Sequence, residues 1–379
     1  MDKKTYVHGD MLKATEYTLL GKLPDPFLMS SGQRVSSVSD WRLRREEIRS
    51  SALNLLYGRT PPEPEFVDVE PICDYRYSAS KVYRIHTGTR AHPLHFRMHI
   101  LLPMVIKEKC PVIVDGDQCF ARSEGYLEAA LSKGIAWILF DRTEIAHDVQ
   151  EETRGHGSIY ETWPGLTCGA LACWAWGYSR CVDALQQLDL PLDLDWIAFT
   201  GHSRGGKTVL LAATVDERIK YVSPNNSGCH GACSYRTVVT DQGDIKRRTE
   251  RLEDMLKNLR HWMGDKLEPY SGREQDLPYD MHYFGALIAP RYYLQNEGMQ
   301  DYWINPIGAW QNFMAVKECY RYLGCEDHAA ALFRPGIHRH KLPDYAEFMD
   351  FMCRVREGKP IREHLTINPY PDIARNFDW

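Results

Sequence analysis

The sequence lacks the long apolar run that a membrane-spanning helix requires. No stretch approaches roughly 18 consecutive apolar residues. The opening segment, residues 1–20, carries charge but no continuous apolar core of the kind that a secretory signal contains. We therefore expect a chain that is neither inserted into a membrane nor exported.

Paired cysteine motifs are also missing. The eleven cysteines are scattered from Cys73 to Cys353 without C-x-x-C spacing. An odd number of unpaired cysteines is typical of reduced thiols, so the pattern predicts a cytoplasmic setting. Cys229 and Cys233 flank His230, but a zinc site needs further ligands at matching spacing, and the sequence supplies none. We predict buried structural cysteines and neither a metal nor another cofactor.

A strong excess of charge of either sign is absent. The 46 Lys and Arg residues against 51 Asp and Glu residues give a formal net charge of -5. This balance gives no reason to expect nucleic acid as a partner. An apolar content of 44% beside 26% charged residues is typical of a globular protein that can bury a sizeable core.

What the sequence does contain is a regular alternation of apolar strands and helices. Residues 81–89 and 94–103 alternate apolar and polar side chains, which predicts a half-exposed antiparallel pair. From residue 111 onward the strands are continuous apolar runs, which indicate a buried parallel sheet. The further expected strands are 111–117, 135–142, 195–200, 221–226, 291–298 and 330–335. The expected helices are 39–58 with Ser39 or Asp40 as N-cap, 123–134, 167–188, 206–214, 308–322 and 343–356.

These elements predict an α/β protein with a doubly wound, mostly parallel sheet and an N-terminal antiparallel extension. We expect a helical and irregular extension over residues 1–60 and a single α/β domain over residues 61–379. An inserted polar segment is expected near residues 236–280.

The stretch FTGHSRGGKTVL, residues 199–210, matches two unrelated motifs. One match is G-x-S-x-G, the elbow that presents a nucleophilic serine, here Ser203. The other is G-x-x-x-x-G-K-T, the phosphate-binding P-loop. A P-loop protein needs a later apolar strand that ends in Asp and helps to hold Mg²⁺, but both strands of that kind precede this loop. We therefore favour the interpretation as a nucleophile elbow over the interpretation as a nucleotide-binding P-loop.

A serine nucleophile needs a histidine base that an acid orients. In α/β-hydrolases the acid and the histidine follow the serine in that order, from loops after later strands. Asp301 and His338 follow the last two expected strands in that order. We predict these two as the partners of Ser203, with His340 as the competing base and Glu297 as the competing acid.

Two cations, Arg204 and Lys207, lie in the first turn of the helix after Ser203. Cations at this position oppose the helix dipole by a few tenths to about 1 kcal/mol each. A purely solubilising role does not explain that cost. We expect the pair to face the developing oxyanion and a hydroxyl-rich substrate.

Around these residues the sequence resembles carbohydrate esterase family 15, the glucuronoyl esterases. The resemblance rests on GHSRGGKT (201–208), NNSGCHGA (225–232), LIAPR (287–291), DYWINP (301–306) and the helix GALACWAWGYSRCVDAL (169–185). It implies an α/β-hydrolase fold and a serine esterase that works through an acyl-enzyme. The implied substrate is a small carbohydrate ester, such as a glucuronoyl or 4-O-methyl-glucuronoyl ester.

The resemblance also implies individual roles. The implied catalytic residues are Ser203 as nucleophile, His338 as base, Asp301 as acid and Arg204 as oxyanion-stabilising arginine. The implied sugar-binding residues are Lys207, Trp303 and Asp241, with Asp244 as second choice for the last. A backbone N–H near Asp117 and Gln118 is expected to complete the oxyanion site, and His282 is expected to be structural.

Two features depart from the family. Many members have a glutamate as triad acid where this chain has Asn226, and members are usually exported. Two alternatives therefore stay open. One is an acetyl-type carbohydrate deacylase with the same triad, and the other is a non-catalytic carbohydrate-binding homologue of the hydrolases.

Overall fold

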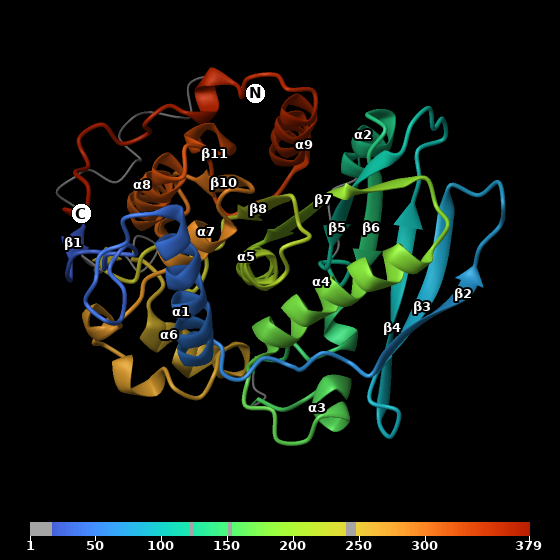
Figure 1. The fold of residues 1–379 in the computed structure, drawn as a ribbon, viewed down its shortest axis with the longest axis horizontal. Helices are drawn as coiled ribbons and strands as arrows, with labels where there is room; N and C mark the ends of the chain where they lie inside the picture. Colours follow the sequence, from blue (N-terminus) through green and yellow to red (C-terminus); the bar gives the residue numbers. More distant parts are fainter. Residues whose placement is uncertain (1–16, 121–124, 151–153, 240–247) are drawn as a thin grey trace.

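The structure is a computed structural model of the 379-residue chain, and it describes residues 17–120, 125–150, 154–239 and 248–379. Figure 1 shows a large twisted sheet with helices on both of its faces. The antiparallel strands lie at one side of the molecule, and the helices of the C-terminal half lie at the other.

Nine strands of the described chain form one sheet in the order β11-β10-β8-β7-β5-β6-β4-β3-β2. The strands are β2 (Phe66–Cys73), β3 (Ser80–Gly88), β4 (Pro93–Leu101), β5 (Cys110–Asp115), β6 (Ala136–Phe140), β7 (Leu192–His202), β8 (Tyr221–Asn225), β10 (Tyr292–Gly298) and β11 (Ala329–Arg334). All neighbours from β11 to β6 are parallel, whereas β4, β3 and β2 continue the sheet in antiparallel fashion. The predicted mostly parallel sheet with an N-terminal antiparallel extension is confirmed.

Strand β2 is missing from the predicted strands. Its pattern is broken by Pro71, and the pairing with β3 shifts register between Pro71 and Cys73. β2 is the last strand on its side of the sheet. A proline is tolerated there because its missing N–H can fall on the side that has no neighbour. The separate pair β1 (Thr18–Leu19) and β9 (Thr237–Val238) is too short for a periodic signal.

The helices cover the sheet in two layers. They are α1 (Val38–Leu56), α2 (Tyr126–Ser132), α3 (Ser158–Thr162), α4 (Ala170–Gln187), α5 (Arg204–Val215), α6 (Leu252–Asn258), α7 (His282–Ile288), α8 (Pro306–Tyr322) and α9 (Leu342–Arg356). Successive side chains of a strand face opposite sides of the sheet. Val112 and Val114 of β5 accordingly pack into the core with α4 and α5, and Ile113 packs into the core with α2 and α9.

Helix α1 begins one turn earlier than predicted. Its N-cap is Ser37 rather than Ser39 or Asp40. The Asp40 N–H donates to the Ser37 hydroxyl and the Ser37 N–H donates to the Asp40 carboxylate, both at 3.1 Å. This reciprocal capping box explains why Asp40 belongs to the first turn and not to the cap.

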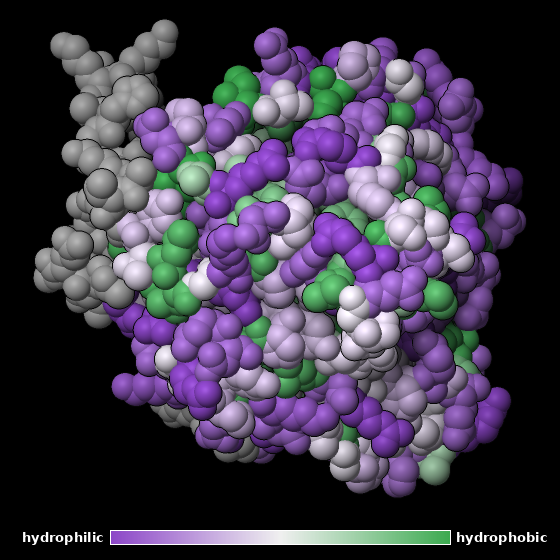
Figure 2. Space-filling model, turned by 60° about the vertical axis from the view of Figure 1, so that its left-hand side comes forward, coloured by the Kyte–Doolittle hydropathy of each residue, from purple (hydrophilic) through white to green (hydrophobic). Residues whose placement is uncertain are grey.

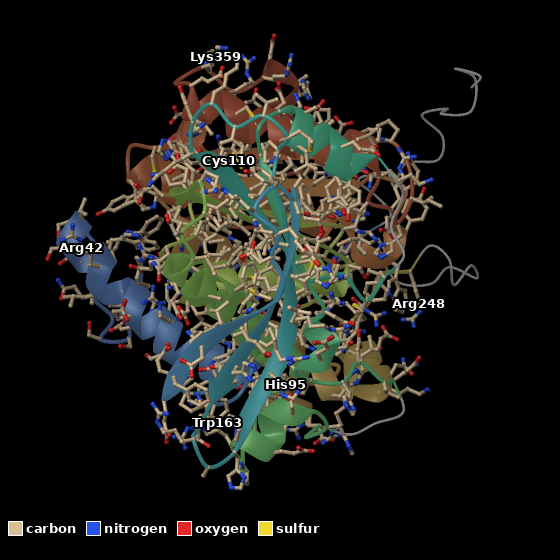
Figure 3. The ribbon with its side chains drawn as sticks, turned by 90° about the vertical axis from the view of Figure 1, so that its right-hand side faces the viewer. Arg42, His95, Cys110, Trp163, Arg248 and Lys359 are labelled. Atoms are coloured by element: carbon tan, nitrogen blue, oxygen red, sulfur yellow. The ribbon has the colours of Figure 1, made fainter. Side chains whose placement is uncertain are left out.

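The predicted inserted segment contains β9, α6 and several short 3-10 turns, and residues 240–247 of it lie outside the described residues. No helix in the part of the chain that the structure describes is both long and apolar enough to cross a bilayer. Figure 2 shows small hydrophobic patches separated by hydrophilic residues on the face it presents. Figure 3 places Cys110, the first residue of β5, toward the same end of the molecule as Lys359, so the carboxyl ends of the parallel strands point away from that end.

Candidate active site

Ser203 lies in the tight turn between β7 and α5. Its φ of 57° and ψ of -119° are rarely adopted by a residue with a side chain. Its N–H donates to the carbonyl of Asn225 at 2.9 Å. A Cβ at Gly201 would lie 2.5 Å from the backbone of Gly205, and one at Gly205 would lie 2.3 Å from the Asp117 carboxylate. The glycines are therefore required by close approach, as in a nucleophile elbow.

Asp301 and His338 meet beside this elbow. Asp301 follows β10, His338 follows β11, and the His338 Nδ1 lies 2.5 Å from Asp301 Oδ2. The Asp301 side chain is 6% exposed and that of His338 is 40% exposed. The His338 ring centroid lies 4.4 Å from that of His202, the residue before Ser203. The structure thus places a buried carboxylate behind an accessible imidazole, which lies against the residue that precedes the serine.

The competing histidine has a different surrounding. The ring of His340 stacks on Tyr345 with 3.7 Å between centroids. Within the part of the chain that the structure describes, the Asp301 carboxylate accepts hydrogen bonds from His338 and Asn226. This geometry favours His338 over His340 as the base.

Asn226 is fully buried and bridges Asp301 to Arg334. Its Nδ2 donates to Asp301 Oδ2 at 2.6 Å, and its Oδ1 accepts from Arg334 Nη2 at 3.1 Å. The guanidinium fixes which end of the amide faces the carboxylate. Arg334 is itself held by an ion pair with Asp344. Asn226 therefore acts as a donor to the acid.

Glu297, the competing acid, is completely buried in β10. Burial and then the nearby charge of Asp301 raise the pKa of Glu297 well above its usual value. One carboxyl oxygen accepts from Gln295 at 3.3 Å, and among the described residues the other has no hydrogen-bond partner. Burial thus opposes the charge that a triad acid needs, and the hydrogen bond to His338 is made by Asp301 instead.

Arg204, the first residue of α5, lies next to Ser203 in the chain. Its Nη1 donates to Asp148 Oδ2 at 2.9 Å, and its side chain is 33% exposed. As a residue of the first helical turn, it also has a main-chain N–H without an intrahelical acceptor. The N–H groups of Asp117 and Gln118, expected at the oxyanion site, donate instead to Asp115 and to the Phe140 carbonyl. The loop after β5 therefore uses these two donors internally, and a backbone donor near them stays a prediction.

Lys207 lies one turn further along α5 and is buried, with 3% of the residue exposed. Its ammonium donates to the carbonyl of Ser227 at 2.7 Å and to that of Cys229, and it lies 3.2 Å from Glu250 Oε2. A P-loop lysine would instead face an open phosphate cradle. The geometry therefore disfavours nucleotide binding.

Glu250 connects Lys207 to Trp303. The Glu250 N–H donates to the Trp303 carbonyl at 2.7 Å, and the Trp303 ring is 38% exposed. The Arg248 guanidinium lies 4.8 Å from the centroid of that ring, and Figure 3 shows Arg248 at the edge of the molecule. Lys207, Glu250 and Trp303 thus form one connected group beside the first turn of α5.

The sequence analysis did not single out Glu250 and predicted Asp241 as the acidic residue that binds the sugar. Asp241 and the second choice Asp244 lie outside the described residues. Several acidic residues follow one another in this segment, and no spacing rule separates them. The only available signal is that Glu250 lies two residues before α6, within the polar insertion.

His282, Cys229 and Cys233 have the buried surroundings of structural residues. His282 is fully buried, its Nε2 lies 2.9 Å from the Pro24 carbonyl, and burial lowers its pKa to about 4. Burial raises the pKa of the Cys229 and Cys233 thiols well above the usual value. Among the described residues, no group of three or more His, Cys, Asp or Glu side chains is arranged to hold a metal ion.

Comparison with known proteins identifies the family. Residues 85–324, more than half of the chain, match the family model described as glucuronyl esterase, fungi. The curated 4-O-methyl-glucuronoyl methylesterase 1 of Wolfiporia cocos is 28% identical over 329 residues, which are 84% of this chain and 76% of that protein. The 4-O-methyl-glucuronoyl methylesterase of Phanerochaete carnosa matches with the same identity and the same shares.

Solved structures agree with the sequence match. A glucuronoyl esterase of carbohydrate esterase family 15 from Caldicellulosiruptor kristjansonii superposes with a TM-score of 0.79 at 27% identity, over 94% of this chain and 97% of that one. The glucuronoyl esterase catalytic domain from Hypocrea jecorina has the same fold, with a TM-score of 0.78 at 24% identity over 95% and 96% of the two chains. The chain therefore belongs to the glucuronoyl esterase family and is a carboxylic ester hydrolase with an α/β-hydrolase fold.

Proposed function

We propose that this enzyme hydrolyses a glucuronoyl or 4-O-methyl-glucuronoyl ester through an acyl-enzyme on Ser203. The observation that carries the proposal is the Asp301–His338 pair, joined at 2.5 Å, beside the strained serine of the elbow. The names of the curated relatives, which are 4-O-methyl-glucuronoyl methylesterases, support the choice of ester.

In the proposed reaction His338 takes the proton of the Ser203 hydroxyl while Oγ attacks the ester carbonyl. Asp301 holds the imidazole in the tautomer whose Nε2 is free to accept this proton. The tetrahedral intermediate collapses, and the alcohol leaves with the proton from His338. Water, activated by the same histidine, then releases the sugar acid and restores the serine.

Arg204 is the proposed donor to the oxyanion of both tetrahedral intermediates. Its guanidinium carries five N–H donors, and among the hydrogen bonds of the described residues only Nη1 is engaged, by Asp148. Donors already aimed at the developing charge are worth more than donors that must reorganise.

The sugar is proposed to lie against Lys207, Glu250 and Trp303. Glu250, held by its ion pair with the buried Lys207, brings acceptor oxygens, and the partly exposed indole of Trp303 brings a flat apolar face. This combination suits a ring with several hydroxyl groups. Asp241 stays a predicted member of the same group.

The decisive experiment compares hydrolysis of a benzyl glucuronate with that of an aryl acetate. We expect turnover of the glucuronate, its loss in Ser203→Ala, and labelling of Ser203 by a serine-directed phosphonate. Cleavage of the acetate alone would identify an acetyl-type deacylase. Absence of both labelling and turnover would identify a non-catalytic carbohydrate-binding protein.

A second comparison assigns the base. His338→Ala should lose activity to a much greater degree than His340→Ala, because the former holds the hydrogen bond to Asp301. The reverse order would reassign the base to His340. The cytoplasmic setting expected from the eleven cysteines, all free thiols, stays a prediction that cell fractionation can test.

A further inference from the structure

We propose that Asp148 is a positioning residue for the reaction: it holds the guanidinium of Arg204 in place beside Ser203, both directly and through Trp262. The inference rests on the proposed role of Arg204 at the oxyanion. Asp148 lies in the loop after β6, far in sequence from the predicted triad, and its side chain is only 6% exposed.

Three donors converge on the Asp148 carboxylate. Oδ2 accepts from Arg204 Nη1 at 2.9 Å. Oδ1 accepts from Trp262 Nε1 at 2.9 Å and lies 3.2 Å from His261 Nε2. Burial opposes the charge, but the hydrogen bond from His261 and the positive charge of Arg204 outweigh it and hold the pKa of Asp148 well below its usual value. The carboxylate is therefore charged and fixed on both of its oxygens.

The indole that Asp148 fixes is the surface on which Arg204 rests. The guanidinium carbon lies 4.7 Å from the Trp262 ring centroid, and it lies 5.6 Å from the ring of Phe120. A cation above an aromatic face is attracted by the electron density of the ring. Asp148 thus holds Arg204 twice, once by a charged hydrogen bond and once by orienting its aromatic support.

A second arginine supports the carboxylate from the interior. Arg142 is completely buried, with Nη2 at 3.9 Å from Asp148 Oδ2, and it forms an ion pair with Asp117. Asp117 in turn accepts the His202 N–H at 3.1 Å, at the elbow itself. The loop after β6 is therefore joined to both sides of the serine turn, so Asp148 has a rigid base.

An arginine side chain that swings freely would have to be ordered in every catalytic cycle, at a cost in rotamer entropy. Arg204 has five N–H donors, and Asp148 engages one of its terminal nitrogens. Among the described residues no other hydrogen bond engages this guanidinium, so its remaining donors can face the oxyanion from a position that is already set. The anchor should therefore act on the transition state and leave substrate binding nearly unchanged.

The test is a double-mutant cycle with Asp148→Asn and Arg204→Ala, measured on benzyl glucuronate and on an aryl acetate. Removing a complete oxyanion donor lowers kcat by about 10²–10³-fold. We expect Asp148→Asn alone to lower kcat about 10–100-fold on both esters, with KM nearly unchanged. In the Arg204→Ala background the same substitution should change kcat less than about threefold, because an anchor has no effect without the side chain that it holds.

Asp183→Asn is the matched control. Asp183 also pairs with arginines, at 2.7 Å from Arg218 Nη1 and from Arg180 Nε, but Arg218 follows the C-terminal end of α5, whereas Arg204 is its first residue. Asp183→Asn should leave kcat unchanged. Asp148→Glu, which keeps the charge, should recover part of the activity, and it serves as a second variant if Asp148→Asn folds poorly.

Equal losses from Asp148→Asn with and without Arg204 would overturn the inference, since the carboxylate would then act independently of the arginine. Full activity of Asp148→Asn on both esters would also overturn it. These outcomes are distinct from failure of the proposed function. If the enzyme cleaves only the acetate, the double-mutant cycle can still be measured on that ester. The glucuronate substrate would then be wrong, but the role of Asp148 in holding Arg204 would still be tested.

Discussion

Asn226 lies directly after β8, at the position where the family resemblance of the sequence implies a glutamate in many members. Its side chain is buried, donates to Asp301 and accepts from Arg334. An amide cannot supply the negative charge that the imidazolium needs during attack. In the proposed mechanism the charge comes from Asp301, whose carboxylate takes hydrogen bonds from both Asn226 and His338.

Asp301→Asn should lower kcat about 10³–10⁴-fold with little change in KM, because the histidine loses the group that holds its productive tautomer. Adding Asn226→Glu in that background should restore part of the activity, since the new carboxylate would lie where Asn226 already contacts position 301. Steady-state kinetics on one glucuronate ester measure both. A loss below tenfold for Asp301→Asn, or a larger loss for Glu297→Gln, would contradict the assignment.

Lys207→Ala should raise KM for a glucuronate ester by about tenfold or more and leave KM for an aryl acetate nearly unchanged, because the variant loses the ammonium that holds Glu250, the proposed acceptor of the sugar hydroxyls. Lys207 also satisfies the carbonyls of Ser227 and Cys229, so the variant should be less stable as well. Glu250→Gln is the matched variant, since it alters the sugar side and keeps the lysine. Equal changes in KM on both esters would show that Lys207 serves the fold or the oxyanion.

At the scale of elements, the start of α4 is packed directly against the segment that carries Trp262. A Cβ added to Gly169 would lie 2.2 Å from the carbonyl carbon of Trp262, closer than any contact that real side chains make. The two backbones can approach in this way only because residue 169 has no side chain.

Gly169→Ala should therefore displace the segment around Trp262 and lower both stability and kcat, the latter through Arg204. We expect a loss of roughly 1–3 kcal/mol in the free energy of unfolding, as for other overpacked sites. Gly21→Ala is the control, because its Cβ would lie 3.6 Å from its nearest neighbour. Thermal unfolding and kcat measured on the same samples test this, and a variant as stable and active as the parent would argue against the packing.

Helices and strands with a clear apolar pattern were predictable. The apolar runs of β5, β6 and β7 and the helix α4 follow from local pattern, because burial on both faces leaves a continuous apolar sequence. Strand β2 was not predictable in this way, since its exposed edge tolerates Pro71 and polar residues. Local pattern reports how a segment is buried, and an edge strand is hardly buried.

The residues of the candidate site also fall into a predictable and an unpredictable group. Ser203, Asp301 and His338 could be predicted because they follow strands whose order fixes where their ends meet. Asp148 and Glu250 could not, because each lies in an irregular segment whose path depends on tertiary packing. Spacing in the sequence carries no record of such contacts.

At the scale of the whole molecule, buried histidines make stability depend on pH. Burial and the charge of Lys207 lower the pKa of His230 to about 3, and burial lowers that of His282 to about 4. Below pH 6.5 the unfolded chain binds a proton on each of these histidines, and the folded chain does not. The free energy of unfolding therefore falls as the pH is lowered from 6.5 toward 4.

His282→Gln removes one of the two histidines that bind a proton on unfolding, and the glutamine amide keeps a donor toward the Pro24 carbonyl. Its stability relative to the parent should improve by about 1.4 kcal/mol for each pH unit below 6.5, until the folded histidine also titrates near pH 4. Denaturant unfolding of both proteins at several pH values measures the difference, in which all other groups cancel. A difference that stays constant with pH would mean that His282 is charged in the folded protein.

The adjacency of β8 and β10 has an evolutionary consequence. The two strands are parallel neighbours, with Asn225 paired to Asn296 in register, so the residues just past their ends reach one place. A lineage can therefore transfer the acid from one strand end to the other by gaining a second carboxylate before it loses the first. Arg334, 3.1 Å from the Asn226 side chain, would neutralise the extra charge in the ancestor that carried both. The family could thus have relocated a triad member through a series of descendants that all remained active.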